Sequence, residues 1–241
     1  MAIEIGAGVE IGGGTAVHTA LSAVTTGLVL QLDAATLSAN PTTWTDSVSS
    51  LTFTLYGAPV YSSAHGGVLQ FVPASSQYAQ SPTQSFASLT QFTVEAWHYY
   101  TGTNSAGSPC ILTELYPGST ARINFNLGNG SDSSPNLQMG FFDGGWRQTT
   151  TGYTLTAGNW YHLMGTYDGA TIRLYVNNSL VRSTAYSGTP VSSRGGIRLM
   201  RRWDAAQYQG GYLGIVRIYN TALSAADVSV NYSADRSRFG L

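Results

Sequence analysis

The stretch that decides the fold is Asn159 to Val181, NWYHLMGTYDGATIRLYVNNSLV, in the last third of the chain. Two strand-like runs flank Asp168-Gly169, a pair favoured at hairpin turns because it tolerates positive φ. From 171 to 176 polar and apolar residues alternate, which is the period-2 pattern of a half-buried antiparallel strand. Asn177-Asn178 then offers a second tight turn. This stretch therefore predicts antiparallel β-structure.

The same pattern continues along the chain, where strand-sized apolar runs recur between turn signals. These runs are Leu28–Leu32, Leu51–Leu55, Val68–Phe71, Phe92–Tyr99, Ile111–Leu115, Arg122–Leu127, Leu137–Phe142, Tyr161–Tyr167, Ile172–Val176, Gly196–Met200 and Tyr212–Tyr219. Their number and even spacing predict an all-β sandwich or barrel. One helix is expected near the C-terminus, where Ser224 can cap it and Asp227 stands at the capping-box position.

Five motifs in order carry a resemblance to a known family. They are GLVLQLDAATLSANPTTWTD from Gly27, the Gly67–Gln80 element, FTVEAW from Phe92, the Asn159–Val181 stretch, and GGYLGIVRIYNTALSAADVSVNY from Gly210. Together they resemble the laminin-G-like branch of the concanavalin A-like lectin/glucanase jelly rolls, over nearly the whole chain after about residue 27. The resemblance implies a jelly-roll β-sandwich of two antiparallel sheets with one short C-terminal helix. We therefore expect a jelly-roll domain over residues 27–241.

Residues 1–26 differ from this domain and form a Gly-rich segment. EIGAG at Glu4 is echoed by EIGGG at Glu10, a near-repeat of six residues. One interpretation is a partly disordered terminus, because chain ends are often poorly ordered. The other is an anchoring or oligomerisation arm that adds a strand to a neighbouring subunit. The arm is favoured because a solvated tail rarely carries so many β-branched residues and so few charges; its apolar residues are Ile3, Ile5, Val9 and Ile11.

Composition narrows the classes of function. All 11 basic residues are Arg, they face 12 acidic residues, and the net charge is -1, which argues against a nucleic-acid partner. Nothing approaches the ~18 consecutive apolar residues of a membrane span, so no membrane partner is expected. The N-terminus has neither the basic nor the apolar region of a secretory signal. Cys110 is the only cysteine, so an intramolecular disulfide is impossible and a reducing cytoplasm is the expected site of synthesis.

Catalytic constellations are missing from the sequence. The glucanases of the resembled superfamily use an E-x-D-x-(x)-E strand, and retaining hydrolysis needs two carboxylates about 5–5.5 Å apart. Here Glu95 and Glu114 each stand alone in their runs, and we expect Glu95 to satisfy a donor within a sheet. The four histidines are scattered, and His162 is expected to be a sheet residue rather than a ligand. The sequence predicts no enzymatic activity and no catalytic residue.

Two loop clusters offer what sugar binding requires, an aromatic platform beside planar polar groups. One is the DGGWR run and the other is the RRWD run with the tyrosine that follows it. The candidate carbohydrate-binding residues are Asp143, Trp146, Arg147, Arg202, Trp203, Asp204 and Tyr208. The alternative is that each Trp seals one end of the sandwich with Arg stacked on it. Trp44, Trp97 and Trp160 fit this structural role better, because they lie in strand motifs.

Calcium is the one metal that the resemblance brings into question, because many relatives hold an ion through carboxylates and carbonyls. In those domains an Asp often follows the Phe of a GGxLxFDG element, whereas here Val72 follows Phe71. Asp132, Asp143 and Asp168 remain as candidate ligands. Each precedes Gly or Ser, so turn formation is the favoured interpretation of all three. No cofactor is predicted.

Three functions are compatible with these observations. The final segment NYSADRSRFGL resembles the end of laminin-G-like proteins encoded by bacteriophages. The leading hypothesis is a non-enzymatic bacteriophage virion structural protein, made in the bacterial host cytoplasm, that decorates the capsid or associates with the tail. It would join other virion proteins through its arm, form a homo-oligomer, and present a lectin-like jelly roll to host-surface or environmental glycans. The alternatives are a free carbohydrate-binding lectin module and, less favoured, a glycan hydrolase.

Overall fold

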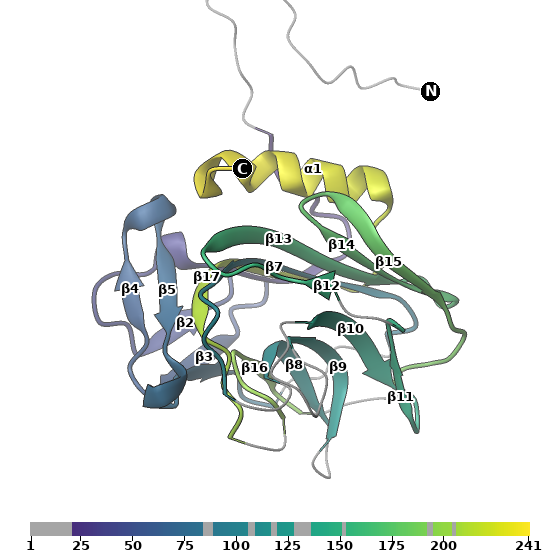
Figure 1. The fold of residues 1–241 in the computed structure, drawn as a ribbon, viewed down its shortest axis with the longest axis horizontal. Helices are drawn as coiled ribbons and strands as arrows, with labels where there is room; N and C mark the ends of the chain where they lie inside the picture. Colours follow the sequence, from purple (N-terminus) through teal and green to yellow (C-terminus); the bar gives the residue numbers. More distant parts are fainter. Residues whose placement is uncertain are drawn as a thin grey trace, which may run out of the picture.

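The structure, a computed structural model, describes residues 21–83, 89–105, 109–116, 120–127, 136–150, 153–191, 195–203 and 206–241. Within these ranges it is a sandwich of two antiparallel sheets with one α-helix on its outside (Figure 1). The first sheet runs in the order β15-β14-β13-β7-β17-β5-β4, with β1 paired to β17. The second runs β11-β10-β9-β8-β16-β6-β3-β2, with β12 paired to β10. The predicted all-β jelly roll is confirmed.

The strands predicted from the sequence form close to their expected bounds, and six further strands are present among the described residues. The first sheet contains β1 (Leu28–Asp33), β4 (Val60–Ser62), β5 (Val68–Phe71), β7 (Phe92–Tyr100), β13 (Asn159–Tyr167), β14 (Thr171–Val176), β15 (Ser179–Ala185) and β17 (Gly211–Tyr219). The second contains β2 (Thr43–Thr45), β3 (Thr52–Tyr56), β6 (Tyr78–Gln80), β8 (Cys110–Tyr116), β9 (Thr120–Leu127), β10 (Asn136–Phe142), β11 (Trp146–Gln148), β12 (Tyr153–Thr154) and β16 (Ile197–Leu199). The helices are α1 (Ala225–Asp235) and the 3₁₀ turns η1 (Ala34–Thr36), η2 (Ala64–Gly66), η3 (Pro73–Ser75) and η4 (Arg236–Phe239).

The turns and the helix cap form as their residues predict. Gly169 has a φ of 94° between β13 and β14, and Asn177 and Asn178 have φ values of 47° and 68° between β14 and β15. Helix α1 begins after Ser224, whose hydroxyl accepts from the backbone N–H of Asp227, while the Asp227 carboxylate accepts from the Ser224 N–H. This reciprocal pair satisfies donors that the first helical turn leaves free.

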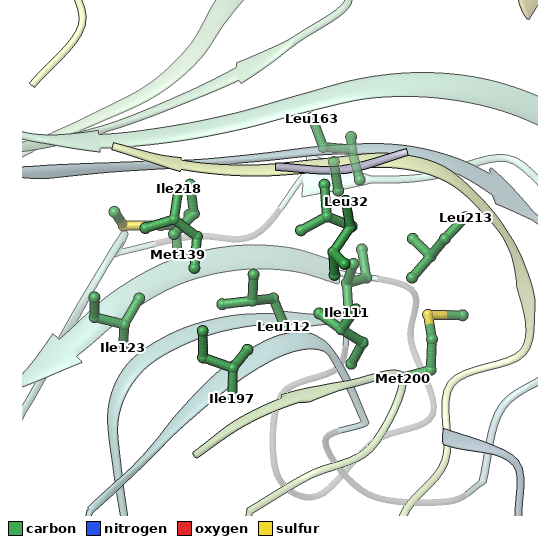
Figure 2. Packing of buried hydrophobic residues seen from close by; sticks show 14 of the residues in the cluster. Leu32, Ile111, Leu112, Ile123, Met139, Leu163, Ile197, Met200, Leu213 and Ile218 are labelled. Carbon is green, nitrogen blue, oxygen red and sulfur yellow. The ribbon is translucent and has the colours of Figure 1, made fainter. Parts of the chain in front are cut away.

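The main core lies between the two sheets. Side chains alternate along each strand, so every second residue points into the sandwich. Figure 2 shows Leu163 and Ile218 from the first sheet lying opposite Met139 and Ile197 from the second. All four are at most 2% exposed. The main core is therefore built from the inward-facing residues of both sheets.

The outer face of the first sheet is covered by α1 and η4 (Figure 1). Val228 of α1 packs on Met164 and Tyr219, and Phe239 of η4 stacks on Trp97 with ring centroids 4.5 Å apart. Trp44, Trp97 and Trp160 are at most 8% exposed, which confirms their predicted structural role. The N-terminal side of the domain joins the same layer, because the Val24 backbone N–H donates to Asn231 Oδ1 at 2.8 Å. The proposed arm residues Ile3, Ile5, Val9 and Ile11 lie outside the described residues.

Candidate functional site

The two loop clusters that were predicted separately from the sequence are in contact on the outer face of the second sheet. Trp146 begins β11, and Trp203 lies in the loop after β16. Their ring centroids are 5.0 Å apart with 40° between the planes, and both residues are half-buried. Three strands separate β11 from β16 in the sheet order, a distance of about 19 Å at the usual strand spacing. The contact therefore depends on the loop after β16 reaching across the sheet.

Local hydrogen bonds shape both loops. On the β10–β11 side, the Asp143 N–H donates to the Gly145 carbonyl at 3.1 Å, and Gly144 between them has a φ of 110°. In the loop after β16, the Arg202 N–H donates to the Gln207 carbonyl at 2.9 Å. The Arg198 guanidinium donates to the Trp203 carbonyl at 2.6 Å, which ties this loop to the sheet below.

Further groups extend the Trp146–Trp203 pair at its sides. The Phe142 ring lies edge-on to Trp146 with centroids 5.7 Å apart. The Arg202 guanidinium carbon lies 4.3 Å from the centre of the Trp203 ring, a cation–π contact. The stacking of Arg on Trp that the sequence suggested is thus present, but the Trp rings lie on the sheet face rather than in the core. An aromatic platform with a guanidinium beside it is the result.

A polar triad lies near the β10–β11 turn, on the face of β11 opposite to Trp146, because Arg147 is paired with the core residue Phe141 and Tyr186 packs against the main core. Asp143 Oδ1 accepts from Arg147 Nε at 3.0 Å, and Asp143 Oδ2 accepts from the Tyr186 hydroxyl at 2.8 Å. The Arg147 guanidinium also lies over the Tyr186 ring, 4.5 Å from its centre. Burial would raise the pKa of Asp143, but the hydrogen bonds from Tyr186 and Arg147 outweigh it and the pKa lies below its usual value. The carboxylate is therefore ionised at neutral pH and fixed in orientation.

The triad forms because the segment after β15 passes close to the β10–β11 turn. A Cβ at Gly188 would lie 2.7 Å from Asp143 Oδ2 and 2.9 Å from the Tyr186 ring, so the small residue permits this contact. Tyr186 and Gly188 were not among the predicted site residues. They follow β15 in sequence and carry no motif, so only the close approach of this segment to the β10–β11 turn reveals them.

The remaining candidate residues are placed as follows. Tyr208 pairs with Arg201 across the base of the loop, and its ring lies 6.1 Å from that of Tyr78, so it belongs to a neighbouring group of aromatic rings. Asp204 and Asp132 lie outside the described residues. The described residues therefore bring together Trp146, Arg202 and Trp203, with Tyr208 to one side, whereas Asp143 and Arg147 form their contacts on the other face of β11.

The candidate metal ligands in the described part of the chain are engaged with protein donors. Asp168 Oδ1 accepts from the backbone N–H groups of Ala170 and Thr171, and its Oδ2 accepts from Arg173. This is the turn chemistry favoured for it. Asp143 is held by its own triad. No group of three or more His, Cys, Asp or Glu side chains within the described ranges is arranged to hold a metal ion.

Glu95 lies on the opposite side of the molecule, beneath α1, and is fully buried. It accepts from His162 Nε2 at 3.1 Å, from Arg217 at 2.8 Å and from Asn231 of α1 at 2.7 Å. Burial would raise the pKa of Glu95, but the charge of Arg217 and the donors around it lower the pKa to about 2. The expectations that Glu95 satisfies donors and that His162 is a sheet residue are confirmed.

A hollow with a volume of about 280 Å³ lies on the first sheet. Its lining includes Tyr99, Trp160, Tyr212 and His65, and the Trp160 Nε1–H donates to His65 Nε2 at 3.2 Å. This hollow was not predicted from the sequence, because its lining residues come from six separate elements. It is one alternative place for a ligand.

Fold and site together define a lectin-like jelly-roll β-sandwich. A family model described as the concanavalin A-like lectin/glucanases superfamily, of the laminin-G type, matches residues 73–229. The chain belongs to this superfamily, as its motifs indicated. No curated protein matches the sequence. Among the described residues, no helix combines the length and apolar character needed to cross a membrane.

Solved structures resemble the chain in fold at low sequence identity. Domain 4 of an extracellular arabinanase from Geobacillus stearothermophilus, in complex with arabinotriose, has a TM-score of 0.66 and 17% identity over 86% of this chain and 98% of that domain. A Trypanosoma rangeli sialidase in complex with sialic acid has a TM-score of 0.63 and 17% identity, over 95% of this chain and 35% of the sialidase. The botulinum neurotoxin type G receptor binding domain has a TM-score of 0.64 and 13% identity, over 86% of this chain and 51% of that domain. At these identities the likeness shows a shared fold.

Proposed function

We propose that the chain is a non-catalytic carbohydrate-binding module whose binding site is the Trp146–Trp203 pair. The observation that carries this proposal is the 5.0 Å approach of two half-buried indole rings from loops 57 positions apart in the sequence. Indole faces bind the apolar face of a sugar ring, and a few fixed polar groups nearby bind its hydroxyls. The Arg202 guanidinium, 4.3 Å from the centre of the Trp203 ring, supplies such a polar group.

The comparisons support a carbohydrate ligand in general terms. The arabinanase domain, nearly all of whose length aligns with this chain, was solved with arabinotriose, and the aligned sialidase was solved with sialic acid. The chain shares a fold with both. The choice of site rests on this chain's own rings.

The proposal that the protein is not an enzyme rests on the protonation and the position of two carboxylates, Asp143 and Glu95. Hydrolysis of a glycosidic bond uses one carboxylic acid of raised pKa beside a second carboxylate. Asp143 has a lowered pKa and donates no proton at neutral pH. Glu95 is buried beneath α1, on the sheet that lies across the core from the aromatic platform. Neither group is placed as a general acid at the site.

We further propose that the protein is a structural component of a bacteriophage particle. The resemblance of the C-terminal segment to phage-encoded relatives supports this setting, and the apolar residues of positions 1–26 support attachment to virion proteins or to further copies of the chain. A free lectin module is the alternative. The mass of the chain in solution, with and without residues 1–20, tests the role of the arm.

Glycan binding is tested with the purified chain on an array of bacterial surface polysaccharides and oligosaccharides, with and without calcium. Trp146→Ala and Trp203→Ala are expected to weaken binding about 10-fold or more, since each removes one stacking face, and 10-fold corresponds to about 1.4 kcal/mol. Tyr212→Ala is the matched control, because it removes a half-buried ring from the hollow on the other sheet. Loss of binding in Tyr212→Ala alone would place the site in that hollow, and binding to no glycan would refute the proposal.

A further inference from the structure

A second cluster of rings and guanidinium groups adjoins the Trp146–Trp203 pair on the same face of the second sheet. The ring of Tyr78 on β6 stacks on that of Tyr56 on β3, with centroids 4.5 Å apart and 6° between the planes. The guanidinium carbon of Arg201 lies 4.7 Å from the centre of the Tyr78 ring and 5.6 Å from that of Tyr208. Because Leu55 and Ala79 point into the core, their neighbours Tyr56 and Tyr78 lie on the outer face.

One donor of the Arg201 guanidinium lacks a polar partner. Its Nε is buried without a hydrogen-bond partner, and no carboxylate of the described residues pairs with it. Arg147, Arg173, Arg217 and Arg238, by contrast, each form an ion pair with a carboxylate. Removing a guanidinium from water without satisfying its donors costs free energy. The contacts with the Tyr rings offset part of that cost, but they leave the Nε–H donor unused.

A second positive charge lies beside Arg201. Arg198 on β16 donates to Gln80 Oε1 at 2.7 Å and to the Trp203 carbonyl at 2.6 Å, so neutral acceptors hold it. Burial, and secondly the charge of Arg201, lowers the pKa of Arg198. Arg198 and Arg201 thus bring two positive charges close together in a chain whose net charge is -1. Two guanidinium groups that repel each other favour the binding of an anion between or beside them.

We propose that Arg201, together with the neighbouring Arg198, forms a subsite for an anionic group of the glycan, which is a carboxylate or a sulfate. A planar guanidinium binds such groups through two parallel N–H bonds, which a neutral hydroxyl does not reproduce. The subsite adjoins the aromatic platform, since Arg198 contacts the Trp203 carbonyl directly. The preferred ligand is therefore an acidic polysaccharide with one unit on the Trp rings and a charged unit at Arg201. This inference rests on the proposed carbohydrate binding and defines the ligand class.

The test uses two pairs of polymers that differ in charge but share a backbone: polygalacturonate with its methyl ester, and dextran sulfate with dextran. The wild-type chain is expected to bind the acidic member of one pair about 10-fold more tightly than the neutral member at low salt, with the preference falling as salt rises. A preference for polygalacturonate identifies a carboxylate subsite, and a preference for dextran sulfate identifies a sulfate subsite.

Substitutions test whether Arg201 is responsible for the preference for acidic polymers. Arg201→Gln is expected to abolish the acidic preference while leaving binding of the neutral member unchanged, and Arg201→Lys to restore it in part, since Lys keeps the charge but not the planar fork. The matched control is Arg236→Gln, which removes one positive charge stacked on Tyr232 beside α1, away from the proposed site. Arg198 is left intact because it also holds the loop of Trp203.

The outcomes separate this inference from the proposed function. Equal binding of acidic and neutral members, lost in Trp203→Ala and unaffected by Arg201→Gln, would overturn the anionic subsite and leave carbohydrate binding in place. An equal loss in Arg201→Gln and Arg236→Gln would show a general charge effect and would also overturn the subsite. Binding to none of the polymers, and to none of the glycans of the array, would overturn both.

Discussion

His98 makes folding stability depend on pH in a range where few other groups act. It lies on β7 on the core side, since its neighbours at alternate positions, Ala96 and Tyr100, belong to the main core. Its Nδ1–H donates to the Tyr212 carbonyl at 3.1 Å, and its Nε2 is buried without a partner. Burial lowers the pKa of His98 from 6.5 to about 4, because a proton on Nε2 would place a charge in the core.

The sign and size of the effect follow from proton linkage. Below pH 6.5 the unfolded chain binds a proton at His98 that the folded chain binds only near pH 4, so stability is full above pH 6.5 and falls as the pH drops. With these two pKa values, the free energy of unfolding at pH 5 is expected to be about 2 kcal/mol lower than at neutral pH, and at pH 4 about 3 kcal/mol lower.

The assay is urea unfolding of the wild-type chain and His98→Asn at pH 7.5 and pH 5.0, followed by tryptophan fluorescence. Asn retains a donor near the position of Nδ1 but does not titrate, so the variant is expected to lose about 2 kcal/mol of the pH dependence. Equal m values at the two pH values would show that the same surface is exposed on unfolding. A pH dependence in His98→Asn equal to that of the wild type would refute the reasoning.

Two further predictions concern the layer around α1 and the N-terminal segment. Glu95→Ala is expected to lower the free energy of unfolding by about 3 kcal/mol or more at pH 7, because it removes a buried acceptor shared by His162, Arg217 and Asn231 and leaves Arg217 with Asp235 alone; urea unfolding measures this, and a loss under about 1 kcal/mol would contradict the importance of Glu95. Deletion of residues 1–20 is expected to convert an oligomer into a monomer with an unchanged thermal midpoint for the domain, as measured by light scattering and calorimetry. A monomer with and without the segment would defeat the arm hypothesis.

Much of the fold follows from local sequence. Alternation identified the long strands, Asp168-Gly169 and Asn177-Asn178 marked turns that form, and Ser224 with Asp227 marked the start of α1. The strands that escaped prediction are β2, β4, β6, β11, β12 and β15. Five of them have two or three residues, too few to establish a period, and β15 is a largely exposed edge strand with the weak alternation of SLVRSTA.

The candidate site was predictable only in its parts. A Trp flanked by charged residues and glycines in a loop is visible in the sequence at Trp146 and again at Trp203. Their contact was not visible, because it depends on where β16 and β11 lie in the sheet and on the path of the loop between them. Tyr186 and Gly188, which complete the polar triad, belong to a third segment that carries no motif.

The sequence by itself determined the all-β class, the turns and the helix cap, because these depend on residue periodicity and on conformational preferences that act over a few residues. The superfamily and its two-sheet architecture followed from the resemblance of five motifs to a known family. The tertiary structure decided which rings share a face, that Arg201 lies against Tyr78 and Tyr208 without a carboxylate among the described residues, and that Glu95 lies beneath α1. These are contacts between segments far apart in the chain. They are fixed by strand order and by packing of the whole sandwich, which local patterns do not encode.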